Sequence, residues 1–123
     1  MQDLIIASTY SSPLASFEIN GNLILKGRSL AMDVNRFYDP LIDWAQKIST
    51  PKVSLVVELD YYNTASGKKI LDLLVAFQDN ENIASFEVIW NYEEDDEDML
   101  EKGQLFAEKL TKTRFIFKEL IDA

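Results

Sequence analysis

The sequence of 123 residues contains no cysteine and no histidine. Without cysteine, the chain has no disulfide, no thiolate metal site and no cysteine nucleophile. Without histidine, it lacks the commonest general base and the commonest metal ligand of proteins. Mechanisms of the Ser–His and Cys–His types are therefore excluded, and an enzyme built from this chain would need carboxylates, lysine or a bound metal.

Basic residues are also few, because 12 lysines and arginines stand against 21 aspartates and glutamates, giving a net charge of −9. This balance argues against binding to nucleic acid or to an anionic membrane surface, since both need a basic footprint. No apolar run approaches the roughly 20 residues that span a bilayer. The start of the chain lacks the basic and apolar regions of a signal peptide. We expect a cytoplasmic protein.

The composition, 47% hydrophobic, suits a single globular domain over residues 1–123 with one core. Asn20-Gly21 between two apolar runs predicts a β-hairpin, because both residues can adopt positive φ. Gly27-Arg28-Ser29 predicts a loop after this hairpin. The next helix is expected to begin at Asp39-Pro40, because proline is tolerated in a first helical turn and not inside a helix.

Apolar and polar residues alternate over residues 53–62 and again over residues 86–92, which predicts two strands. In the first strand, Tyr61 is expected on the core face and Tyr62 on the polar face. A helix over residues 64–79 separates the two strands, so the strands should be parallel. The expected buried stripe of this helix is Ile70, Leu71, Leu74, Val75 and Phe77.

Acidic residues on the second face of these strands, Glu58, Asp60 and Glu87, indicate that one face of the sheet is open to water or to a partner. A third helix over residues 96–110 and a peripheral strand over residues 113–119 follow. We therefore predict an α/β fold, a two-layer mixed β-sheet with helices mainly on one face.

Thr64 lies between the first of these strands and its helix, in Tyr62-Asn63-Thr64-Ala65-Ser66-Gly67-Lys68-Lys69. Helix N-termini favour negative charge through their free N–H groups and the macrodipole. This first turn nevertheless has no acid and is followed by Lys68 and Lys69. Either a phosphate is carried or bound there, or these residues form an ordinary Ser/Thr/Asn cap with solvated lysines.

Six consecutive acids, Glu93-Glu94-Asp95-Asp96-Glu97-Asp98, follow the second strand. An EF-hand loop alternates acids with spacers and needs a central glycine, and this run has neither. The run is interpreted first as an acidic helix start, second as a patch that faces a partner, and last as a metal site. Because it follows the carboxyl end of a parallel strand, we expect it on the same rim as Thr64.

Several blocks of sequence, in a shared order and spacing, carry a resemblance over nearly the whole chain. They are Gly27-Arg28-Ser29, Phe37-Tyr38-Asp39-Pro40-Leu41-Ile42-Asp43-Trp44, Tyr62-Asn63-Thr64-Ala65-Ser66 with a following lysine, Val88-Ile89-Trp90-Asn91-Tyr92, and Asp95-Asp96-Glu97-Asp98-Met99-Leu100-Glu101-Lys102-Gly103. With these blocks the chain resembles the SiaC family of bacterial regulatory phosphoproteins. It departs from the family at Ser29-Leu30-Ala31-Met32, where Ser-Tyr-Pro-Glu is usual.

The resemblance implies a fold similar to anti-sigma-factor antagonists and a signalling switch that is not an enzyme and needs no cofactor. In the family, a dedicated Ser/Thr kinase phosphorylates a threonine and a PP2C-type phosphatase removes the phosphate. The unphosphorylated form can bind and activate a diguanylate cyclase, which raises cyclic-di-GMP and promotes biofilm formation. The phosphoacceptor corresponds to Thr64, with Asn63, Ser66 and Lys68 around it.

The same blocks supply candidate partner-binding residues. These are Arg28, Ser29, Tyr62, Trp90, Tyr92, Asp95 and Asp96. The alternative function is an acidic protein-interaction module whose binding depends on residues 93–98 and not on phosphorylation. Such a module would ignore Thr64→Glu and lose binding when the acidic run is neutralised.

Overall fold

The protein is described by a computed structural model that covers residues 1–30 and 32–121. Residues 31, 122 and 123 of the expected domain, and with them Ala31 of the departing segment, lie outside the described residues. The strands are β1 (Leu4–Ile6), β2 (Leu14–Phe17), β3 (Asn22–Ser29), β4 (Lys52–Tyr62), β5 (Ser85–Glu93) and β6 (Arg114–Leu120). The helices are α1 (Val34–Lys47), α2 (Thr64–Gln78) and α3 (Glu97–Lys109).

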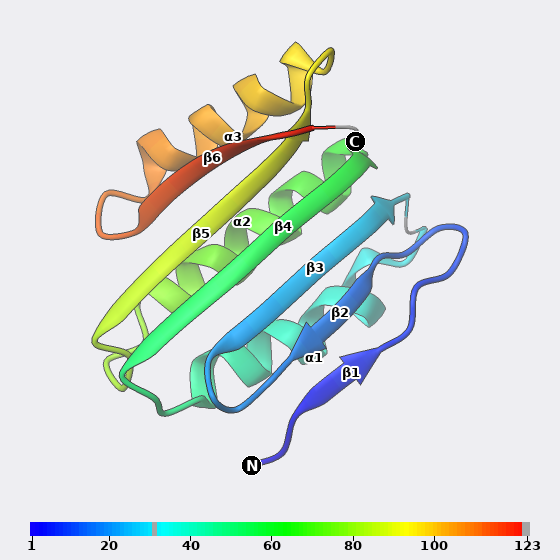
Figure 1. Cartoon of the computed structure of the whole chain (residues 1–123). Helices are drawn as coiled ribbons and strands as arrows, with labels where there is room; N and C mark the ends of the chain where they lie inside the picture. Colours follow the sequence, from blue (N-terminus) through cyan, green and yellow to red (C-terminus); the bar gives the residue numbers. More distant parts are fainter. Residues whose placement is uncertain (31, 122–123) are drawn as a thin grey trace.

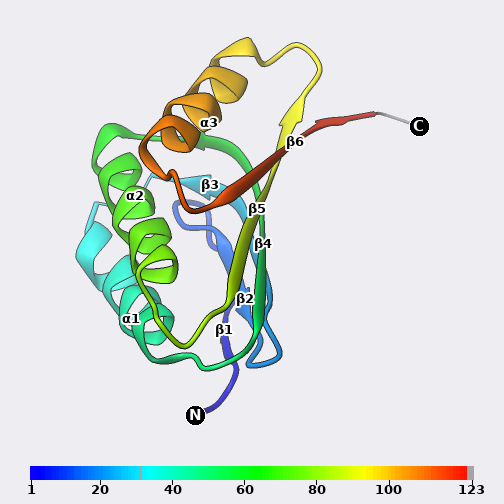
Figure 2. The same cartoon turned by 90° about the vertical axis from the view of Figure 1, so that its left-hand side faces the viewer.

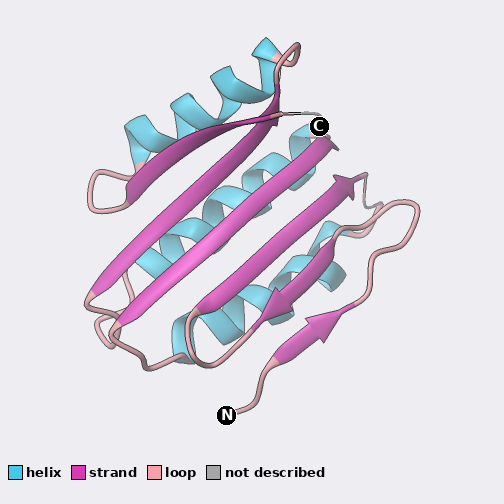
Figure 3. Cartoon of the chain, in the orientation of Figure 1, coloured by secondary structure: helices cyan, strands magenta, loops and turns pink. Residues whose placement is uncertain are grey.

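The six strands form one mixed sheet whose order follows the chain, β1-β2-β3-β4-β5-β6 (Figures 1 and 3). The pairs β1–β2 and β2–β3 are antiparallel, and the three later pairs are parallel. The three crossovers β3–α1–β4, β4–α2–β5 and β5–α3–β6 all advance toward β6. Because such crossovers share one handedness, their helices lie on the same face of the sheet. Figure 2 shows α1, α2 and α3 together on that face, so the predicted two-layer mixed α/β fold is confirmed.

The opposite face of the sheet carries polar side chains, as predicted. Glu58 on β4 forms an ion pair with Lys26 at 3.2 Å, and Glu87 on β5 pairs with Lys52 at 3.0 Å. Among residues 1–30 and 32–121, no helix combines the length and the apolar composition needed to cross a membrane.

The hairpin between β2 and β3 is confirmed, but its turn differs from the predicted one. Gly21 has φ +95°, whereas no described residue other than glycine has positive φ. The N–H of Gly21 donates to the carbonyl of Glu18 at 3.0 Å, and the N–H of Glu18 donates to the carbonyl of Asn22 at 3.2 Å. A turn with this hydrogen-bond pattern needs one residue of positive φ, which is Gly21. Asn20 therefore keeps a negative φ.

The segment from β3 to α1 corrects two expectations. Residues 27–29 continue β3, because this strand pairs with β4 as far as the Ser29–Tyr62 register. The helix begins at Val34 and contains Pro40, whereas the sequence indicated a start at Asp39-Pro40. Asp33 caps it by accepting the N–H of Arg36 at 3.1 Å, and this cap sets the start in spite of the proline.

A register shift near the end of β4 reverses the expected orientation of two tyrosines. Leu59 pairs with Gly27 and Tyr61 pairs with Arg28, so Asp60 is an extra residue on β4. An extra residue turns every later side chain to the other face. Tyr61 is therefore 51% exposed, and Tyr62 is buried on the helical side at 7% exposure.

The core lies between the sheet and the helices. On α2 the fully buried apolar residues are Ile70, Leu73, Leu74 and Phe77, which follow the i, i+3, i+4, i+7 spacing of one helical face. The predicted stripe omitted Leu73 and included Val75, which lies off this face and is exposed. The predicted third helix and the peripheral last strand are confirmed as α3 and the edge strand β6.

Candidate functional site

Thr64 is the first residue of α2, directly after the carboxyl end of β4, and its side chain is exposed. Asn63 caps the helix, because its Oδ1 accepts the N–H of Ser66 at 2.9 Å. The first turn contains no acid, and exposed Lys68 follows Thr64 by four residues on the same helix face. The junction is therefore an Asn-capped helix N-terminus with the exposed Thr64 hydroxyl at its edge and a cation one turn away.

Lys69, which follows Lys68 in the sequence, does not contribute its charge to the Thr64 junction. Its Nζ forms an ion pair with the Asp39 carboxylate of α1 at 2.8 Å. This contact joins α1 to α2. Lys68 is thus the lysine of the pair that remains available to the Thr64 junction.

Ser66 is completely buried and belongs to a chain of hydroxyls beneath the junction. Its Oγ donates to the carbonyl of Ser29 at 3.0 Å, and the Oγ of Ser29 donates to the Oγ of Ser66 at 2.8 Å. Each hydroxyl has one proton, so Tyr38 must donate in the 2.6 Å contact between its OH and the Oγ of Ser29. The three side chains fix the end of β3 against the start of α2.

Burial raises the pKa of Tyr38 to about 12, an effect that its hydrogen bonds with Ser29 and Ser66 partly offset. Tyr38 therefore stays a neutral donor throughout the physiological pH range. Since Ser66 is buried, bonded and coupled to this tyrosine, a kinase could reach its hydroxyl only if the helix start opened.

Tyr62 connects the junction to α3. Its ring stacks on that of Phe106 with centroids 6.2 Å apart, and the ammonium of Lys102 lies 4.6 Å from its centroid. Lys102 also pairs with Asp98 at 3.2 Å. Burial, followed by the charges of Asp98 and Tyr38, raises the pKa of the Tyr62 hydroxyl. The end of β4, next to the start of α2, therefore packs against the middle of α3.

A groove of about 370 Å³ runs between α2 and α3, and Thr64 is part of its wall. The groove is lined on the α2 side by Thr64, Lys68 and Leu71, and on the α3 side by Lys102, Leu105 and Lys109. The three residues of α2 follow i, i+4, i+7 spacing and those of α3 follow i, i+3, i+7 spacing, so each set lies on one helix face. The residues of α3 were not among the predicted site residues, although this spacing is visible in the sequence.

The acidic run lies at the carboxyl end of β5, on the rim that also carries Thr64 (Figure 1). Glu93 ends the strand, and Glu97 and Asp98 form the first turn of α3. Asp96 caps this helix by accepting the N–H of Met99 at 3.0 Å. Within residues 1–30 and 32–121, no group of acids is arranged to hold a metal ion. Asp96, Glu97 and Asp98 thus form the acidic helix start that the composition indicated, and Glu94 and Asp95 are exposed before it.

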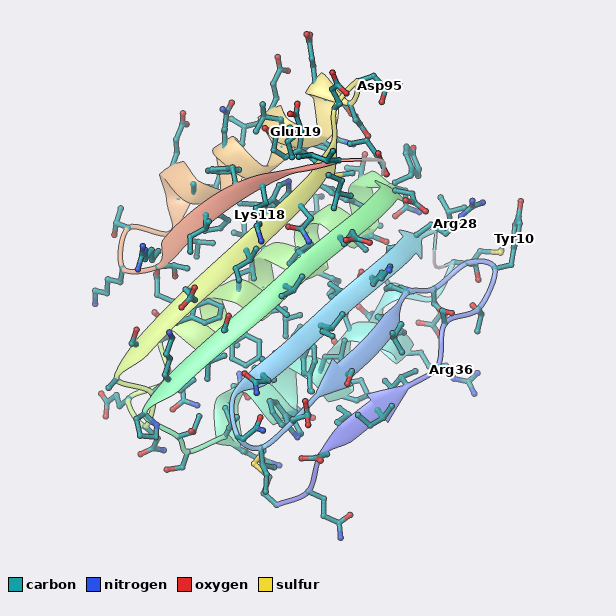
Figure 4. The ribbon with its side chains drawn as sticks, in the orientation of Figure 1. Tyr10, Arg28, Arg36, Asp95, Lys118 and Glu119 are labelled. Carbon is teal, nitrogen blue, oxygen red and sulfur yellow. The ribbon has the colours of Figure 1, made fainter. Side chains whose placement is uncertain are left out.

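The candidate partner-binding residues lie in different environments. Ser29 and Trp90 are completely buried, and the indole N–H of Trp90 donates to the carbonyl of Met99 at 3.0 Å. Arg28 lies 5.4 Å from the centroid of the Tyr10 ring. In Figure 4, Arg28 is at the end of β3 and Asp95 follows β5, with the end of β4 between them. Tyr62 is buried, and Tyr92 and Asp96 are half-buried. Arg28 and Asp95 are therefore the two candidate residues whose side chains are exposed to a partner.

Comparison with known proteins agrees with this architecture. The sequence profile of the SiaC family regulatory phosphoprotein matches residues 6–120. The chain belongs to the SiaC family. Comparison with curated protein sequences gives no match.

Solved structures of this family have the same fold. SiaC of Pseudomonas aeruginosa is 24% identical with a TM-score of 0.81, over 98% of this chain and 100% of that one. Apo-SiaC of Pseudomonas aeruginosa is 25% identical with a TM-score of 0.76, over 96% and 99%. A crystal structure of the diguanylate cyclase SiaD in complex with its activator SiaC, from the same organism, matches with 25% identity and a TM-score of 0.82, over 96% and 100%.

Proposed function

We propose that the chain is a non-enzymatic cytoplasmic switch that a Ser/Thr kinase phosphorylates on Thr64 and a PP2C-type phosphatase restores. Its phosphorylation state gates binding to a downstream effector such as a diguanylate cyclase. The observation that carries this proposal is the exposed hydroxyl of Thr64 at the start of a helix whose first turn contains no acid. Membership of a family of regulatory phosphoproteins supports it.

The local chemistry supports Thr64 as the acceptor. A phosphate adds a charge of about −1.5 to −2 at neutral pH. At this position it can accept bonds from the free N–H groups of the first turn and approach Lys68. Ser66, two residues later, is buried and donates its proton to the carbonyl of Ser29. Of these two hydroxyls, Thr64 is the accessible one.

The effector part of the proposal is supported by a relative. SiaC of Pseudomonas aeruginosa is the activator found in complex with the diguanylate cyclase SiaD. The present chain covers all of that SiaC chain at 25% identity. A diguanylate cyclase is therefore the first effector to test, and an effect on cyclic-di-GMP and biofilm formation is expected.

The test is intact-mass measurement after incubation with ATP and a Ser/Thr kinase from the same genome. We expect one added phosphate, absent from Thr64→Ala and present in Thr113→Ala, a control at another threonine near a helix end. A phosphate that persists in Thr64→Ala would contradict the proposed site. Pull-down of the effector with the phosphorylated and the unphosphorylated protein then measures how much the phosphate weakens binding.

The acidic module is tested in the same pull-down. Glu94→Gln together with Asp95→Asn removes two exposed charges of the run without touching the Asp96 cap. If the effector is lost from this variant and retained by phosphorylated protein, the acidic run is the binding determinant and the switch proposal fails. Retention by the variant and loss on phosphorylation supports the switch.

A further inference from the structure

The groove between α2 and α3 has a charge opposite to that of the rest of the molecule. The chain carries 21 acids and 12 lysines and arginines. The described residues that line the groove nevertheless include three lysines, Lys68, Lys102 and Lys109, and no acid. Lys68 on α2 and Lys109 on α3 are exposed, whereas Lys102 is half-buried and paired with Asp98 at 3.2 Å. An occupant of the groove therefore meets positive charge on both of its walls.

The local charge decides which groups the groove favours at contact. Charges beyond the Debye length of about 8 Å are largely screened at physiological ionic strength. Six of the acids lie together in residues 93–98 at the start of α3, whereas the three lysines belong to the lining of the groove itself. Close to the surface, the groove therefore attracts anionic groups in spite of the overall repulsion.

The groove also exposes apolar surface, so a bare anion would not complement it. Leu105 is 56% exposed and Tyr61 51% exposed, and both line the groove together with half-buried Leu71. Beneath them, the stacked rings of Tyr62 and Phe106 form the floor. A space between two helices that offers an apolar floor and charged walls suits an amphipathic helix.

We propose that this groove binds an acidic amphipathic helix of the effector, with its apolar side chains against Leu105 and Tyr61 and its carboxylates beside Lys68 and Lys109. This inference rests on the proposed phosphorylation of Thr64 for its regulation, and the docking itself does not depend on it. Because Thr64 lines the same groove, a phosphate there competes with the carboxylates of the helix for Lys68 and repels them.

The test uses two synthetic amphipathic peptides and the full chain. One peptide has leucines along one helix face flanked by glutamates, and the other has every glutamate replaced by lysine. Each is titrated into the ¹⁵N-labelled chain, and amide chemical shifts give both the affinity and the place of binding. The groove variant is Lys68→Gln, Lys102→Gln, Lys109→Gln. The control variant, Lys47→Gln, Lys112→Gln, Lys118→Gln, removes the same charge from exposed lysines elsewhere.

We expect the acidic peptide to shift amides of the groove and to bind the groove variant about tenfold more weakly than the control variant, since exposed ion pairs each contribute modestly. Lys102 contacts Tyr62, so Lys68→Gln with Lys109→Gln serves as a second variant that keeps this contact. Equal weakening in groove and control variants would overturn the proposal. Shifts away from the groove, tighter binding of the basic peptide, or no binding at peptide concentrations of about 1 mM would also overturn it.

Thr64→Glu separates the docking from its regulation. If the acidic peptide binds this variant several-fold more weakly than Thr64→Gln, both the groove and its control by charge at Thr64 are supported. Binding that is lost in the groove variant and unchanged in Thr64→Glu supports the docking groove and counts against the proposed phosphorylation switch.

Discussion

The hydroxyl of Ser66, in the first turn of α2, donates to the main-chain carbonyl of Ser29 at the end of β3, 37 residues earlier in the chain. The same carbonyl accepts the N–H of Asn63 at 3.1 Å. One residue of β3 therefore holds both the cap residue and the first turn of the helix that presents Thr64. The position of the exposed threonine depends on a buried serine pair.

Ser66→Ala should lower the free energy of unfolding by about 1–3 kcal/mol, the cost of leaving a buried partner unsatisfied. The substitution removes the acceptor of the Ser29 hydroxyl and one donor to the Ser29 carbonyl. Urea denaturation measures the change. Thr64→Ala is the control, because at an exposed position the change should stay within about 0.5 kcal/mol. Equal stability of the two variants would show that the hydroxyl chain does not stabilise the fold.

Gly103→Ala should destabilise the protein by about 1–3 kcal/mol through overpacking. A Cβ at Gly103 would lie 2.6 Å from the Nε1 of Trp90, a buried ring held by its bond to Met99. Gly67→Ala is the matched control within a helix, because its Cβ would lie 3.0 Å from Tyr62 and alanine gains about 1 kcal/mol of helix propensity over glycine. Thermal unfolding followed by tryptophan fluorescence compares them, and a larger loss at Gly67 would contradict the packing argument.

The layout of the fold could be predicted from hydrophobic periodicity, because the strand–helix–strand unit around Thr64 shows its alternation directly in the sequence. The orientation of Tyr61 and Tyr62 could not be predicted in this way. It depends on the extra residue Asp60, which appears only when β4 pairs with Gly27 and Arg28 of another strand. Alternation within one strand contains no information about such a shift.

The candidate site was predictable to a similar extent. The cap position of Asn63 and the helix-start position of Thr64 could be predicted from local capping preferences, because both residues are adjacent to the helix in the sequence. The burial of Ser66 depends on Ser29 and Tyr38, which are distant in sequence, so the local sequence does not show that its hydroxyl is less accessible than that of Thr64. The lysines of α3 were missed for the same reason, because their proximity to Thr64 arises from tertiary packing.

Stability should fall as pH rises above about 10, and Tyr38→Phe should reduce this fall. Tyr38 has its pKa raised from 10.0 to about 12 in the folded protein, so below pH 10 the hydroxyl is protonated in both states. Between these values the unfolded chain loses the proton and the folded protein keeps it, which costs about 1.4 kcal/mol of stability per pH unit. Urea denaturation from pH 9 to 12 gives the slope. Tyr10→Phe, at an exposed ring, is the control, and an unchanged slope in Tyr38→Phe would contradict the assignment.

Thr64→Glu should leave the fold intact and raise the free energy of unfolding by about 0.3–1 kcal/mol, because a negative charge is favourable at a helix N-terminus. Lys68, four residues later on the same face, adds to this effect. Thr64→Lys should change stability in the opposite direction, and both effects should shrink in high salt. Urea denaturation measures the stabilities, and amide shifts should change near Thr64 and not across the sheet. Widespread shifts in Thr64→Glu would indicate that charge at this position reorganises the fold, and gating by charge at the docking surface would then be ruled out.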